Sequence, residues 1–150
     1  MDVITKKYQS IYNAIASFSL SIDEYKKWKN DINPQKAHSI GADYEPILIG
    51  LRDSSIQRFE YSVDTLWKYL KIYLEIKYNI IVTIPAPANI VRESSKLKII
   101  TEKNAEIVLE MIKSRNMTSH IYQEEIAEVL AQSLPAYRDV MQNIINTLKP

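Results

Sequence analysis

The sequence predicts an all-α protein, an antiparallel up-and-down helical bundle of four to five main helices plus short helices. Three observations predict it. Apolar residues recur at intervals of three and four along most of the 150 residues, which is the pattern of helices with one buried face. Only 2 glycines are present, few for a protein that must make many tight β-turns. Only residues 79–84 are strand-like, and one strand has no partner with which to form a sheet.

The length and composition favour one domain over residues 1–150, long enough to bury a core. The chain has 19 basic and 18 acidic residues, so its net charge of +1 creates no overall field toward DNA or anionic lipid. Cysteine is absent, which excludes disulfides, thiolate metal sites and a cysteine nucleophile. The N-terminus has no apolar signal segment and no uncharged run is long enough to span a bilayer, so we expect a cytoplasmic protein.

The first apolar stripe predicts a helix over about residues 2–19. It consists of Ile4, Tyr8, Ile11, Tyr12, Ile15 and Phe18. Ser21 and Glu24 have the spacing of a capping box, which predicts that a second, short and basic helix begins there.

The short basic helix carries the highest density of lysine in the chain. Lys26, Lys27 and Lys29 form either a small phosphate-contacting patch or a solvated face above Tyr25 and Trp28. Residues 30–46 contain two prolines and a glycine, so we expect a loop in which His38 is exposed.

A long central helix is predicted from Pro46 to Lys77. Its buried stripe comprises Ile56, Phe59, Val63, Leu66, Leu70 and Tyr73, widened by Trp67 and Leu74. Beside this stripe, Glu60 and Asp64 lie four residues apart on one face, which is unfavourable unless a cation is near. They are therefore candidate partners of a buried arginine. Acid/base catalysis or a metal site is the alternative, but no histidine is spaced to join them, and we expect no metal.

Residues 79–84 are interpreted as an extended connection, after which Pro87 begins a short helix. Thr101 is the expected N-cap of the following helix, which leads to Arg115. After it, apolar residues keep step at three and four from Ile126 to Leu148. Because this phase survives Pro135, we expect one long C-terminal helix that is kinked at the proline.

Arg115 and His120 are the candidate catalytic residues. Apolar residues recur at intervals of three and four at Ala105, Val108 and Ile112. The next position of this pattern that faces the core is Arg115. A half-buried guanidinium keeps its charge, so it must be paired or must face a solvated cleft that uses it. Five residues later, His120 provides a type of side chain that accepts and donates protons near neutral pH.

An arginine and a histidine without metal ligands suit cleavage of RNA through its own 2′-hydroxyl. His120 would take the 2′-hydroxyl proton or protonate the departing 5′-oxygen, while Arg115 would bind the phosphate oxygens as their charge rises. One histidine cannot easily do both, so a two-fold homodimer that brings two motifs into one cleft would supply the second. The alternative is a buried polar network that fixes a helix junction.

The polar residues between and beside this pair have two interpretations. Asn116, Thr118 and Ser119 would donate hydrogen bonds to the phosphate or would cap the helix ends. Tyr122 would place a hydroxyl at the edge of the same site.

The motif formed by Arg115, Asn116, His120 and Tyr122 resembles the Arg-x(4-6)-His motif of HEPN domains, in the form with a tyrosine two residues after the histidine. Three further stretches resemble the nucleotidyltransferase substrate-binding branch of that superfamily, namely Ile56–Tyr61, Trp67–Lys68 and Val91–Glu93. The resemblance is strongest over about residues 50–148.

This resemblance implies a helical bundle that dimerises and a metal-independent ribonuclease site at Arg115 and His120, with no cofactor. It also implies a partner, a separately encoded minimal nucleotidyltransferase (MNT), which in toxin–antitoxin pairs silences the toxin by adding AMP to the tyrosine, here Tyr122. Two alternatives remain open. The chain is a non-catalytic subunit that presents a substrate to the nucleotidyltransferase, or a structural bundle in which Arg115 pairs with Glu60 or Asp64.

Overall fold

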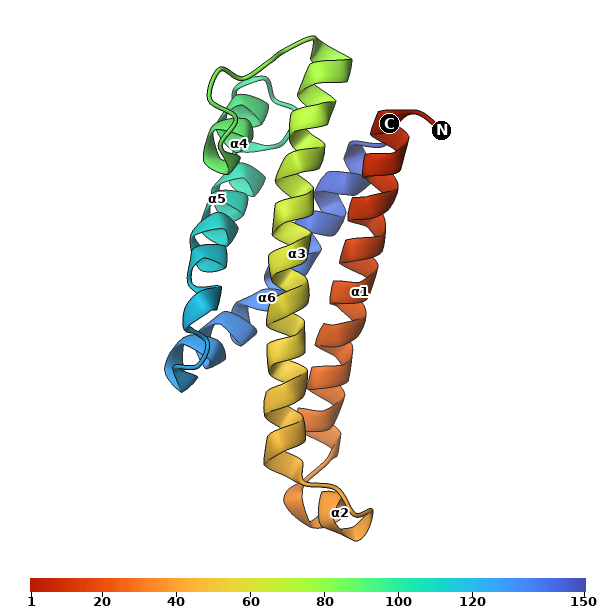
Figure 1. The fold of residues 1–150 in the computed structure, drawn as a ribbon, viewed down its shortest axis with the longest axis vertical. Helices are drawn as coiled ribbons and strands as arrows, with labels where there is room; N and C mark the ends of the chain where they lie inside the picture. Colours follow the sequence, from red (N-terminus) through yellow and green to blue (C-terminus); the bar gives the residue numbers. More distant parts are fainter.

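A computed structural model describes residues 1–150 and confirms the all-α class. The elements are α1 (Val3–Asp31), α2 (Pro34–Ser39), α3 (Tyr44–Tyr78), α4 (Pro87–Lys96), α5 (Glu102–Asn116), the 3-10 turn η1 (Thr118–His120) and α6 (Glu124–Thr147). The long helices α1 and α3 lie side by side in opposite directions, α4 and α5 flank α3, and α6 crosses behind α3 toward the end that holds both termini (Figure 1). None of these helices combines the length and apolar character that a bilayer-spanning segment needs.

The prediction of two helices in the first thirty residues is wrong, because α1 is continuous from Val3 to Asp31. Ser21 caps nothing: it is buried, and its hydroxyl donates to the carbonyl of Phe18 at 2.7 Å. A serine inside a helix can bond to a carbonyl one turn back, so a capping-box sequence does not by itself end a helix.

The segment predicted as a loop over residues 30–46 contains the short helix α2. Asn33 caps it, because its side-chain oxygen accepts a hydrogen bond from the amide of Lys36 at 2.7 Å. His38 is exposed on this helix, as predicted. The sequence did not predict α2 because a helix of six residues is too short to show an apolar period.

The central helix α3 provides the core, as its apolar stripe predicted. Six side chains of the predicted stripe are buried, namely Ile56, Phe59, Val63, Leu66, Leu70 and Leu74. Tyr69, which was not part of the prediction, is also buried, whereas Trp67 and Tyr73 are only partly buried. The ring of Phe59 lies 6.0 Å from that of Phe18 on α1 and stacks at 5.4 Å on that of Tyr137 on α6. One side chain of α3 therefore contacts both neighbouring helices, and burial of these rings holds the three together.

Between α3 and α5 the structure confirms the extended connection, the helix that begins at Pro87 and the N-cap at Thr101. α3 ends at Tyr78, and its C-cap Asn79 has φ 56°, in the left-handed region that asparagine tolerates. Residues 79–86 form no strand, α4 begins at Pro87, and the Thr101 hydroxyl accepts from the amide of Asn104 at 3.1 Å.

α6 continues through Pro135 as one helix, which confirms the prediction from its apolar phase. Its axis changes direction along its length (Figure 1). Proline has no amide hydrogen, so the carbonyl of Ala131, four residues before it, lacks its usual helical donor.

Candidate functional site

The residues singled out in the sequence lie at the junction between α5 and α6. Arg115 is in the last turn of α5, and η1 ends at His120. The junction is tightly wound, because the amide of His120 donates to the Met117 carbonyl at 3.0 Å and the amide of Gln123 donates to the His120 carbonyl at 2.9 Å. His120 therefore sits on a backbone fixed by local hydrogen bonds.

Arg115 is held by two carboxylates of the central helix. Its guanidinium lies 3.2 Å from the Glu60 carboxylate and 3.4 Å from that of Asp64, and the side chain is 33% exposed. The two acids lie four residues apart on one face of α3, so the cation between them relieves their repulsion. With both acids ionised, one cation faces two anions, and the cluster is net negative.

Thr118 connects Arg115 to the 3-10 turn. Its hydroxyl accepts from the Arg115 guanidinium at 2.9 Å and donates to the Arg115 carbonyl at 2.8 Å. Thr118 is buried, so its hydroxyl is fully used inside the protein. Of its two interpretations, the structure supports closing the helix end rather than contacting phosphate.

His120 and Tyr122 project into solvent next to each other. Their ring centroids are 6.2 Å apart with planes inclined by 55°, and Tyr122 is 78% exposed. The imidazole of His120 makes no hydrogen bond within the protein, while the Tyr122 hydroxyl has only a 3.4 Å contact from the Gln123 amide. Both groups are therefore free to react with a partner or substrate.

Asn116 and Ser119 are also exposed, and neither side chain hydrogen-bonds within the protein. Arg115 and Asn116 line a cavity of about 280 Å³, together with Val63, Asp64, Trp67, Pro87 and Ile112. His120 does not line this cavity and makes no hydrogen bond to Arg115. Within one protomer the structure therefore joins Arg115 to Glu60 and Asp64 but does not join it to His120.

Sequence reasoning missed Arg52, an arginine that is only 2% exposed and so more deeply buried than Arg115. Its guanidinium donates to Asp53 at 3.0 Å, to Glu124 at 2.5 Å and to Glu128 at 3.0 Å. Burial by itself would lower the pKa of Arg52, but the hydrogen bonds to these carboxylates outweigh it and raise the pKa. The side chain is therefore charged and fixed.

Arg52 anchors the first turn of α6, which follows directly on the exposed His120 and Tyr122. The segment between α5 and α6 is thus held on one side by Arg115 and Thr118 and on the other by Arg52 and Glu124. A signal was present in the sequence, since Arg52 lies four residues before Ile56 on the apolar stripe of α3. This is the same kind of signal that singled out Arg115.

Two solved structures of toxin–antitoxin proteins resemble this fold. A tri-AMPylated HEPN toxin of Shewanella oneidensis, in complex with MNT antitoxin, gives a TM-score of 0.68 at 15% identity over 98% of this chain and 97% of that one. A toxin–antitoxin with AMP-PNP gives a TM-score of 0.62 at 15% identity over 99% of this chain and 100% of that one. At this identity, the likeness concerns the fold.

A crystal structure of a protein from Thermus thermophilus has a TM-score of 0.65 and 25% identity, covering 89% of this chain and 99% of that one. Comparison with curated proteins finds no match. The model of the family described as nucleotidyltransferase substrate binding protein like matches residues 6–150, which extends the resemblance through most of α1. The chain therefore belongs to the family of nucleotidyltransferase substrate binding protein like proteins.

Proposed function

We propose that this protein is the toxin of a toxin–antitoxin pair, a homodimeric and metal-independent endoribonuclease that an MNT partner silences by adding AMP to Tyr122. The observation that carries the proposal is that two exposed groups, the imidazole of His120 and the phenol of Tyr122, lie next to each other. They lie at the α5–α6 junction, where Arg115 donates a hydrogen bond to Thr118. The fold that the chain shares with an AMPylated HEPN toxin supports it.

In this proposal His120 is the general acid/base. It takes the proton of the RNA 2′-hydroxyl, the 2′-oxygen attacks phosphorus, and the bond from phosphorus to the 5′-oxygen breaks. The 5′-oxygen leaves with a proton, so the products end in a 2′,3′-cyclic phosphate and a 5′-hydroxyl. Asn116 and Ser119 donate hydrogen bonds to the phosphate, and Arg115 stabilises its growing charge.

A second protomer is part of this mechanism for two reasons. One histidine cannot act as base and acid in the same step, and His120 does not line the cavity of Arg115 in its own protomer. Beside the motif, a groove between α5 and α6 exposes the apolar side chains of Met117 and Val129. Burying such a patch against its symmetry mate favours a two-fold dimer.

RNA cleavage by the purified protein tests the proposal. We expect cleavage of single-stranded RNA in the presence of EDTA, with products that end in 2′,3′-cyclic phosphate, and no cleavage of the matching oligonucleotide with 2′-deoxyribose. Product ends are read by mass spectrometry. Intact substrate, or cleavage of the deoxy oligonucleotide, would contradict it.

The ion pairs of Arg115 favour a second candidate function, a non-catalytic subunit that presents a substrate to a nucleotidyltransferase. Glu60 and Asp64 already neutralise the guanidinium and leave a net negative charge, which disfavours a phosphate at that point. This alternative predicts a stable complex with the MNT protein and no RNA cleavage by the isolated dimer.

Tyr122 is the expected acceptor of AMP. After coexpression with an MNT protein, intact-mass spectrometry should show the protein heavier by a whole number of AMP groups, and RNA cleavage should fall because negative charge and bulk now lie beside His120. Tyr122→Phe should lose an AMP group. Tyr61→Phe is the matched control, because Tyr61 is 60% exposed but lies on α3. Retention of every AMP group by Tyr122→Phe would exclude this assignment.

A further inference from the structure

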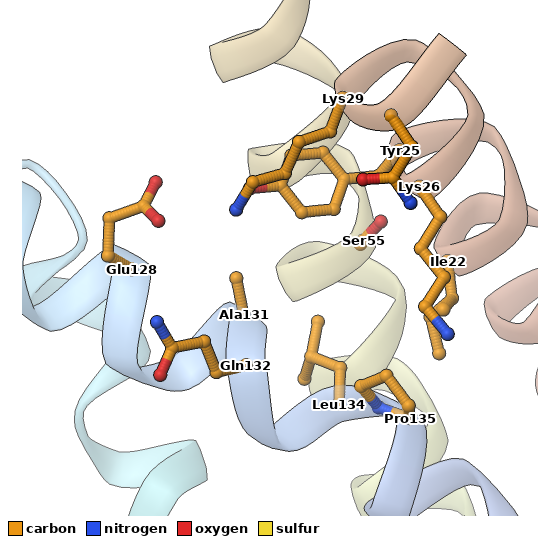
Figure 2. A pocket seen from close by; sticks show the side chains of 11 residues that line it. Ile22, Tyr25, Lys26, Lys29, Ser55, Glu128, Ala131, Gln132, Leu134 and Pro135 are labelled. Atoms are coloured by element: carbon orange, nitrogen blue, oxygen red, sulfur yellow. The ribbon is translucent and has the colours of Figure 1, made fainter.

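A cavity of about 260 Å³ lies between α1, α3 and α6, away from the groups discussed so far (Figure 2). Its floor is mainly apolar and is made by Ile22, Tyr25, Ala131, Leu134 and Pro135, together with the hydroxyl of Ser55. Its rim is polar and exposed, made by Lys26, Lys29, Asn30 and Gln132. Neither Arg115, His120 nor Tyr122 lines it, so the cavity is separate from the proposed ribonuclease site.

The rim of this pocket carries two lysine side chains. Lys26 and Lys29 form no ion pair, although Lys29 lies 5.6 Å over the ring of Tyr25. The one acid of the pocket, Glu128, lies 3.0 Å from Arg52 and shares that cation with Asp53 and Glu124. In Figure 2 the Lys29 ammonium lies on the side of the pocket nearest Glu128, and that of Lys26 lies near Ile22. Two cations therefore border one apolar floor.

The pocket also presents hydrogen-bonding groups that the protein does not use. The side-chain amides of Asn30 and Gln132 make no hydrogen bond within the chain. A polar group without a protein partner has either water or a ligand as its partner. The hydroxyl of Ser55, by contrast, is taken by the carbonyls of Ser21 and Leu51.

We propose that this pocket binds a small organic anion, with its aromatic or compact aliphatic body on the floor and its phosphate or carboxylate held at the rim by Lys26 or Lys29. The ring of Tyr25 and the face of Pro135 suit a flat body, and the two ammonium groups suit the charge. The volume lies just below the range of about 300–1,000 Å³ that drug-sized ligands occupy, so the ligand is small. This inference does not depend on the ribonuclease proposal.

Binding here also bears on the start of α6. Glu128 belongs both to the wall of the pocket and to the carboxylates around Arg52. The charge of a ligand anion next to Lys29 would therefore act on Glu128, and through Arg52 on Glu124 at the start of α6.

Titration of the full-length protein with phenyl phosphate and with benzoate, followed by amide chemical shifts in NMR, tests the proposal. Phenol and inorganic phosphate, the two parts of phenyl phosphate, are the control ligands. Phenol lacks the charged group, and inorganic phosphate lacks the apolar body. We expect either organic anion to bind at least about tenfold more tightly than both control ligands, with shifts centred on residues 22–30 and 128–135. The tighter of the two identifies the head group. Binding of neither, binding no tighter than the control ligands, or shifts elsewhere would overturn the proposal.

Removing the positive charges on the rim is a second test of the proposal. The double variant Lys26→Gln with Lys29→Gln should weaken binding of the better probe about tenfold, because it removes the charge-assisted contact from whichever lysine holds the anion. Lys27→Gln is the control, since Lys27 is on the same helix but does not line the pocket, and it should change affinity by less than about twofold. Equal losses in both variants would show general charge attraction and would overturn the pocket assignment.

Discussion

Replacing His120 with alanine is expected to lower the rate of RNA cleavage by about a hundredfold to ten thousandfold, the usual contribution of a general acid/base. The free energy of unfolding should change by less than about 0.5 kcal/mol, because the side chain is exposed and makes no hydrogen bond in the protein. The two effects are measured by initial rates on an RNA oligonucleotide and by urea denaturation followed by circular dichroism.

The chain supplies its own control in His38, which is its only other histidine and is exposed on α2. His38→Ala should leave both rate and stability unchanged. If His120→Ala retains the original rate, the catalytic assignment of His120 is wrong. If instead its stability falls by several kcal/mol, the imidazole has a structural role that its solvent exposure does not reveal.

Arg115 has both a proposed chemical role and an observed structural one, so its substitution is more complex. Arg115→Ala removes a phosphate ligand in the ribonuclease proposal and also leaves Glu60 and Asp64 facing each other without a cation. Arg115→Lys separates the roles, because lysine keeps the charge between the acids but cannot bind phosphate with a planar fork.

Arg52→Ala is expected to lower the free energy of unfolding by about 2–4 kcal/mol. The substitution removes three hydrogen bonds and leaves Asp53, Glu124 and Glu128 without their shared cation. The cost stays below that of a fully buried ion pair, because these carboxylates are partly exposed and can turn to water. Urea denaturation measures the loss, and hydrogen exchange should show faster exchange in the first turns of α6.

Arg58→Ala is the matched control for Arg52. Arg58 is on the same helix but is exposed, and it donates only to the hydroxyls of Ser17 and Ser54. Its removal should cost less than about 1 kcal/mol. Similar losses in the two variants would show that the carboxylates around Arg52 contribute little beyond what any surface arginine of α3 contributes.

Much of the fold was predictable because helix signals are local. The apolar stripe of α3, the N-cap at Thr101 and the unbroken phase across Pro135 each depend on residues within a few turns of one another. Where local signals compete, prediction failed: Ser21 and Glu24 have the spacing of a helix start, yet packing of α1 along α3 keeps the helix continuous. Tertiary burial outweighs a capping preference of about 1 kcal/mol.

The candidate site was predictable only in part. The sequence singled out Arg115 because a charged residue occupied a core position, and it named Glu60 and Asp64 as candidate partners because two acids on one face need a cation. It did not indicate that Thr118 is buried with its hydroxyl hydrogen-bonded to Arg115, nor that His120 does not line the cavity of Arg115.

The sequence by itself determined where most of the helices lie and which side chains are able to do chemistry near the α5–α6 junction, but not the continuity of α1 or the presence of α2. Only the tertiary structure decided which of those side chains meet. Arg52 contacts Glu124 and Glu128 across 72 and 76 residues of chain, and the pocket at Lys26 and Lys29 combines residues from three helices. The physical reason is that helical periodicity acts over a few residues, whereas ion pairs and cavities depend on distances in space that exist only after the helices have packed.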